Sequence, residues 1–170
     1  MKRLFALFAN RGGTAAAELA LVMPMMLIIM FGSAEVGNYF LNEHALVKAV
    51  RDGARFAARQ SFTNYTSCSG APGGTVEADT KNVVMNGYLT GGALLVPNMT
   101  LASVTVSTSC SAMAGGETME GIYRDRIGGS GAQIVTVSAR VNYRSLIGAF
   151  GFTGTGMTLN AKSQAAVAGI

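Results

Sequence analysis

The chain has 170 residues, which is room for one domain and a membrane segment but hardly for two full domains. Its composition is 49% hydrophobic and only 13% charged, which is more apolar than is usual for a soluble domain. Three of the 13 cations lie in residues 1–13, and the remaining ten nearly balance the nine acids. The net charge of +4 therefore does not reflect a basic patch on the rest of the chain, and we expect no nucleic-acid partner.

Residues 1–13 are short, basic and weakly apolar, and they end in Gly12-Gly13 ahead of a long apolar run. A secretory signal peptide places its apolar region before its cleavage site, so cutting at these glycines would leave the apolar run in the mature protein. Ala15–Ala17 offers an alternative signal-peptidase site, although Asn10 and Arg11 interrupt the apolar region ahead of it. We therefore expect residues 1–13 to be a leader of another kind.

A single carboxylate, Glu18, precedes sixteen uncharged residues, Leu19–Ala34. As a helix these sixteen would span about 24 Å, somewhat less than a bilayer core needs, so we expect flanking residues to extend a transmembrane helix over 14–41. Pro24 is expected to kink this helix or loosen one turn, which membrane helices tolerate. The alternative, a buried core helix of a soluble protein, is hard to accommodate in so small a chain.

No proline interrupts residues 35–60, so the same helix is expected to continue beyond the membrane as an amphipathic extension over 42–60. Small and apolar residues recur on one face, namely Leu46, Val50, Gly53 and Ala57, and the opposite face carries His44, Lys48, Arg51, Arg55 and Arg59. The small-residue stripe is suited to pack against a sheet or a helix. We expect the basic row to be a solvated face rather than a ligand site.

Residues 61–170 are expected to form a small extracytoplasmic α+β domain with one further helix and a roughly three-stranded antiparallel sheet. The helix is predicted over Thr75–Leu89, with Thr75 as N-cap and Gly91-Gly92 as the stop. Period-2 alternation predicts strands over Leu101–Cys110, Gln133–Arg144 and Met157–Val167, each with one face buried. The predicted inward residues are Val104, Val106 and Cys110, then Val135, Val137, Ala139, Val141 and Tyr143, then Met157, Leu159, Ala161, Ala165 and Val167.

Two connections of the predicted sheet differ in character. Ser111–Gly131 is polar and rich in glycine, and an exposed loop explains its charges. Leu146–Gly156 is apolar, with Phe150 and Phe152 among glycines. We favour packing of these two rings within the domain, with contact to a partner subunit or to the membrane surface as the alternative.

Both cysteines, Cys68 and Cys110, follow the apolar segment. If that side is periplasmic or extracellular, they are the natural disulfide pair. Closing their separation of 42 residues would constrain the unfolded chain by about 4 kcal/mol on the loop-entropy estimate. The alternative is a pair of reduced, buried cysteines.

Catalytic constellations are absent from the sequence. The chain has one histidine, and no HExxH, CxxC, Gly-x-Ser-x-Gly or phosphate-loop motif occurs. We therefore predict that the chain is not an enzyme, binds no metal and uses no cofactor.

Four stretches together resemble the TadE-like family of minor pilins and pseudopilins of the tight-adherence (Tad/Flp) pilus machinery. They are Gly13–Leu19, Pro24 within the apolar helix, Glu35–Gly37 and Val50–Ala58. The resemblance is strong over residues 11–58 and loose beyond them. Leu19 departs from the family pattern, in which many members carry Phe or Tyr after the glutamate.

The resemblance implies a processing site between Gly13 and Thr14, where a prepilin peptidase in the bacterial inner membrane cuts. Glu18 then becomes the fifth residue of the mature protein. The implied role is assembly, initiation or anchoring of a fibre. The implied partners are the prepilin peptidase, other pilin or pseudopilin subunits, the Tad secretion machinery and inner-membrane lipid.

The leading cations Lys2, Arg3 and Arg11 place the N-terminus in the cytoplasm and the C-terminal domain in the periplasm by the positive-inside rule. The family adds an expectation of incorporation into an extracellular pilus. A carboxylate in a membrane segment costs about 2.5–3.5 kcal/mol on insertion scales, so we expect Glu18 to pair with the amine of an adjacent subunit.

Two other readings of the sequence remain open. In the first, the chain is an unprocessed single-pass membrane protein whose extracytoplasmic domain binds a ligand, which requires an intact N-terminus and gives Glu18 no role. In the second, the chain is an anchored periplasmic enzyme, which requires a cleft.

Overall fold

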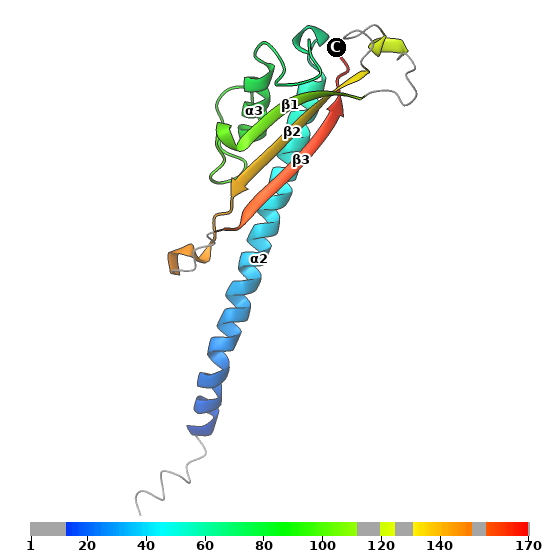
Figure 1. Cartoon of the computed structure of the whole chain (residues 1–170). Helices are drawn as coiled ribbons and strands as arrows, with labels where there is room; N and C mark the ends of the chain where they lie inside the picture. The colour runs from blue at the N-terminus through cyan, green and yellow to red at the C-terminus, as the bar shows by residue number, and fades with distance from the viewer. Residues whose placement is uncertain (1–12, 112–119, 125–130, 151–155, 170) are drawn as a thin grey trace, which may run out of the picture.

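The computed structural model describes residues 13–111, 120–124, 131–150 and 156–169. Its axis is a 45-residue helix, α2 (Thr14–Ala58), which carries a small head on its C-terminal half (Figure 1). At 1.5 Å per residue α2 is about 68 Å long. The helix runs through Pro24 without interruption.

The head consists of a second helix and one sheet. These are α3 (Val76–Asn86), β1 (Val104–Ser111), β2 (Ala132–Asn142) and β3 (Thr158–Ala166), with short 3₁₀ turns η2 (Phe62–Asn64), η3 (Leu101–Ser103), η4 (Gly121–Tyr123) and η6 (Ile147–Phe150). The strands are antiparallel in the order β1-β2-β3. The predicted α+β fold, with its long N-terminal helix, second helix and three-stranded antiparallel sheet, is confirmed.

One face of the sheet packs on α2, and the opposite face is open to solvent (Figure 1). The strands alternate as predicted: Val104, Val106, Val135, Val137, Ala139, Val141, Tyr143, Leu159 and Val167 are buried against the helices. Met157 was predicted to point inward and is instead 46% exposed. It lies beyond the last cross-strand pair, Asn142 with Thr158, at the open edge of the sheet.

The buried stripe of α2 is the one that its spacing predicted. Leu46, Val50, Gly53 and Ala57 are buried, while the basic row on the opposite face is exposed. Gly53 lets α3 approach closely, because a Cβ built on it would lie 2.3 Å from Val84 Cγ2. The stripe therefore serves packing within the head.

The end of α3 is three residues away from its predicted position. The helix begins after Thr75 as expected, but it ends at Asn86, and Gly87 caps it in the left-handed region at φ 77°. The Gly87 N–H donates to the carbonyl oxygen of Val83. Glycine adopts this conformation without the steric penalty of a Cβ, so Gly87 ends the helix ahead of Gly91-Gly92.

The sheet lies along α2 between two levels. At the level of Ala58, the Ala168 N–H donates to the Ala58 carbonyl oxygen at 2.7 Å. At the level of Glu35, the connection that follows β2 meets the helix. We call the end of the head at Glu35 the proximal end and the end at Ala58 the distal end.

Candidate functional site

The N-terminal end of α2 holds the three residues that the sequence singles out for processing and assembly. Gly13 is the N-cap of α2 and Thr14 is its first helical residue. A Cβ built on Gly13 would meet no atom within 4 Å, so the chain lies in open space here. Glu18 is exposed one turn further on. Because residues four apart are neighbours on a helix surface, Thr14 and Glu18 share one face.

Every residue of α2 from Thr14 to Ala34 is exposed, and we call these 21 residues the bare segment (Figure 1). Its exposed large apolar side chains are Leu19, Leu21, Val22, Met23, Met25, Met26, Leu27, Ile28, Ile29, Met30 and Phe31. As a helix the bare segment is about 32 Å long, close to the ~30 Å of a bilayer core. By length and composition, α2 is able to cross a membrane.

A set of hydrogen bonds joins α2 to the head where the bare segment ends. Glu35 Oε2 accepts from the backbone N–H groups of Leu146 at 3.0 Å and Ile147 at 3.3 Å. One turn later, Asn38 Nδ2 donates to the Tyr143 hydroxyl at 2.7 Å, and that hydroxyl donates to the Glu35 carbonyl oxygen at 3.3 Å. We call these five residues the neck.

Tyr143 is the buried member of the neck. Its ring meets Tyr39 edge to face, with 5.2 Å between the ring centroids. Burial raises the pKa of the Tyr143 hydroxyl above its ordinary value of 10.0, and the Glu35 carboxylate acts in the same direction. The hydroxyl therefore keeps its proton at neutral pH and remains a donor.

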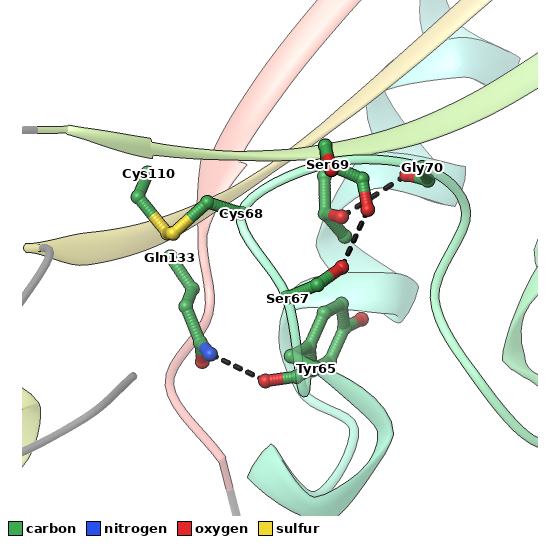
Figure 2. The surroundings of a disulfide bond; sticks show 8 residues. Tyr65, Ser67, Cys68, Ser69, Gly70, Cys110 and Gln133 are labelled. Carbon is green, nitrogen blue, oxygen red and sulfur yellow. Dashed lines mark hydrogen bonds between the residues drawn. A yellow bond between two sulfur atoms is a disulfide. The ribbon is translucent and has the colours of Figure 1, made fainter. Parts of the chain in front are cut away.

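The predicted cysteine pair is joined at the distal end of the head. Cys68 and Cys110 form a disulfide with a Cα–Cα distance of 5.0 Å (Figure 2). Nearby, the Thr108 backbone N–H and hydroxyl both donate to the Gly70 carbonyl oxygen, at 2.7 Å and 3.0 Å. The loop that contains Cys68 thus covers the outer edge of β1.

A buried polar contact supports the same loop. Figure 2 shows Gln133 directed from β2 toward the loop, where its Nε2 donates to the Tyr65 carbonyl oxygen. The Tyr65 hydroxyl in turn donates to the Ala57 carbonyl oxygen near the end of α2. Sheet, loop and helix are therefore tied together at the distal end.

Sequence patterns missed the neck and the Gln133 contact. The available signals were that Glu35 follows the uncharged run and that Tyr143 lies near the end of the most regular alternation. Neither signal indicates which residue the side chain contacts. The alternation that predicts a strand from Gln133 onward indicates no role for its side chain. The part of the chain that the structure describes holds no group of three His, Cys, Asp or Glu residues able to bind a metal ion.

Some predicted features lie outside the described residues. The leader does so except for Gly13, and so do Phe152 and the side chain of Phe150. The described part of the Leu146–Gly156 connection places Leu146, 59% exposed, at the proximal end.

These features define a class of protein: a small α+β head on one long, apolar N-terminal helix, an arrangement consistent with a single-pass membrane protein or a pilin-like protein. Residues 13–55 match the family described as TadE-like protein, so this part of the chain is a TadE-like family domain. The pilin-like proteins of this family are not known as enzymes. No curated protein and no solved structure matches the chain.

Proposed function

We propose that the chain is a minor pilin or pseudopilin that takes part in assembly, initiation or anchoring of a Tad/Flp-type pilus. One coincidence carries the proposal: the TadE-like match begins at residue 13, and α2 begins at Thr14 with its bare apolar segment. A cut after Gly13 would remove the basic leader and leave the helix whole. The mature protein would then start with the bare segment.

Cleavage would also give the carboxylate of Glu18 a partner. The new amine of Thr14 is a cation, and it lies on the same helix face as Glu18, one turn away. When copies stack with an axial offset, the Glu18 carboxylate of one copy pairs with the Thr14 amine of the next. This pairing offsets the cost of a charge in lipid and sets the offset between subunits.

The topology follows from the leader and the cysteines. The leading cations hold the N-terminus in the cytoplasm, and the head is then periplasmic. An oxidising periplasm suits the disulfide between Cys68 and Cys110.

N-terminal sequencing tests the cleavage. The full chain is produced with and without a prepilin peptidase of a Tad system, extracted from membranes and sequenced. We expect Thr14 as the first residue with the peptidase and Met1 without it. An intact N-terminus in both preparations would support the unprocessed binding protein instead.

Two variants sharpen this test. Gly13→Leu should block cleavage without disturbing the fold, because the built Cβ meets open space. Gly12→Ala, one residue earlier, is the matched control and should leave the cut in place. Equal cleavage of both variants would remove Gly13 from the processing site.

The assembly role of Glu18 is tested with Glu18→Gln, which keeps the shape of the side chain and removes its charge. Two differently tagged copies are produced with the peptidase, and their copurification from membranes is measured. We expect cleavage and insertion as in the unaltered protein, with loss of copurification. Copurification at the original level would overturn the pairing of Glu18.

A further inference from the structure

The apolar surface of the bare segment does not stop at the helix. At the proximal end of the head, Leu146 is 59% exposed and Met157 is 46% exposed. Leu146 belongs to the neck, where it donates its N–H to Glu35, and Met157 adjoins the neck, because its carbonyl oxygen accepts from the Tyr143 N–H at 3.0 Å. Phe40 and Leu41 on α2 are exposed just above the same level. Exposed apolar side chains of the helix and of the head therefore lie at the same level.

The level of this surface follows from the helix. The bare segment is about as long as a bilayer core is thick, so a membrane that covers it ends near Glu35. The neck fixes the proximal end of the head at that same height. The head therefore meets the membrane surface wherever α2 spans the bilayer.

The charged residues of β2, β3 and the segments that flank them are all cations. From Gly131 to Ile170 the sequence contains three cations and no acidic residue. Arg140, Arg144 and Lys162 are all exposed, and within the described residues none of them forms an ion pair. This stretch contains no carboxylate, and the Glu35 carboxylate at the proximal end accepts hydrogen bonds from the Leu146 and Ile147 N–H groups.

The register of the sheet orders these cations by height. Arg144 follows Tyr143 at the neck, and Arg140 pairs with Asn160, two residues above the last pair of the ladder. Lys162 pairs with Ser138, four residues above that pair. At about 3.3 Å per residue, Arg140 starts roughly 7 Å and Lys162 roughly 13 Å above the proximal end of the sheet. The two arginines are thus the nearest to the membrane surface.

We propose that the proximal end of the head docks on the outer leaflet of the membrane that α2 spans. Leu146 and Met157 enter the interface, and Arg144 and Arg140 bind the phosphates of anionic phospholipids. This inference rests on the proposed function only in that α2 crosses a bilayer. The docked head would hold the subunit upright in the membrane before it joins a fibre.

The absence of tryptophan from the chain offers a direct test. Leu146→Trp places a single fluorophore at the proximal end, and Ile122→Trp, at a residue 57% exposed in η4 near the distal end, is its matched control (Figure 1). Leu27→Trp reports on the bare segment. Each full-length variant is reconstituted into phosphatidylcholine vesicles with and without phosphatidylglycerol, some with brominated acyl chains that quench tryptophan.

We expect Leu27→Trp to be strongly quenched, Ile122→Trp not to be quenched, and Leu146→Trp to be quenched and blue-shifted, more so with phosphatidylglycerol. If Leu146→Trp behaves like Ile122→Trp while Leu27→Trp is quenched, docking is wrong and the membrane span stands. If Leu27→Trp is not quenched, the span fails and docking fails with it.

The charge contacts are tested in the Leu146→Trp background. Arg140→Ser combined with Arg144→Ser should abolish the extra quenching that is seen when the vesicles contain phosphatidylglycerol. Lys162→Ser alone should reduce this extra quenching by less than the double substitution does. High salt should have the same effect as the double variant, since the Debye length falls from about 10 Å at 0.1 M to about 3 Å at 1 M. An unchanged lipid dependence in the double variant would overturn the role of the arginines.

Discussion

Glu35 and Leu146 are 111 positions apart in the sequence, yet a carboxylate oxygen of the first lies 3.0 Å from the backbone nitrogen of the second. This bond closes the proximal end of the head onto α2. At the distal end the Ala168 N–H donates to the Ala58 carbonyl oxygen at 2.7 Å. The head is therefore attached to the helix at both ends of the sheet, which lets a single helix position it.

Replacing Glu35 should loosen the proximal end. Glu35→Ala removes the carboxylate acceptor of the exposed Leu146 N–H and the partly buried Ile147 N–H, at a cost of about 0.5–1.5 kcal/mol in the free energy of unfolding for each lost bond. Denaturant unfolding in detergent measures the change, and amide exchange at residues 146 and 147 should accelerate. Glu77→Ala, which breaks a surface ion pair with Lys81, is the control and should cost about 1 kcal/mol or less. Equal losses in the two variants would contradict a special role of the neck.

Gly53 should not tolerate a side chain. In Gly53→Ala the new Cβ would lie 2.3 Å from Val84 Cγ2, and such overpacking costs about 1–3 kcal/mol. This exceeds the gain of about 1 kcal/mol in helix propensity. Gly37→Ala in the same helix meets no atom within 4 Å, so it should not destabilise the protein. Thermal unfolding of both variants measures the difference, and Val84→Ala should partly rescue Gly53→Ala.

Periodicity was sufficient to predict most of the fold. The 3.6-residue stripe through Leu46 and Val50 and the period-2 runs of β1 and β2 each describe one buried face, and burial of one face is what a local pattern records. The prediction of where α3 ends was wrong because Gly87 and Gly91-Gly92 can each end a helix. All three glycines have positive φ, so only the bond from the Gly87 N–H to the Val83 carbonyl oxygen decides between them.

The contacts that position the head could not be predicted from local sequence patterns. Glu35, Tyr143 and Gln133 each find a partner far away in sequence, and no spacing rule links residues 111 positions apart. Met157 was misplaced because alternation continues past the point where the ladder ends. The pairing of Cys68 with Cys110 was accessible only because the chain has two cysteines.

Removing the disulfide should destabilise the distal end more than removing any single hydrogen bond there. Cys68→Ser with Cys110→Ser frees a loop of 42 residues in the unfolded state, and the loop-entropy estimate is about 4 kcal/mol. Denaturant unfolding of the variant, and of the unaltered protein with and without a reductant, measures this loss. The variant should not respond to the reductant. A variant as stable as the oxidised protein would show that the bond contributes nothing to the fold.

Tyr65 should make stability fall at alkaline pH. Burial raises the pKa of its hydroxyl from 10.0 to about 12 in the folded protein, because the charged form is poorly solvated beside α2. The folded state therefore holds the proton more tightly than the unfolded state, so this contribution is complete below about pH 10 and is lost as the pH rises through about 12. Tyr65→Phe should lack this part of the decline, at a cost near neutral pH of about 1 kcal/mol for the lost bond to the Ala57 carbonyl oxygen. Unfolding at a series of pH values, with Tyr88→Phe as an exposed control, tests this; identical pH profiles for the unaltered protein and Tyr65→Phe would contradict it.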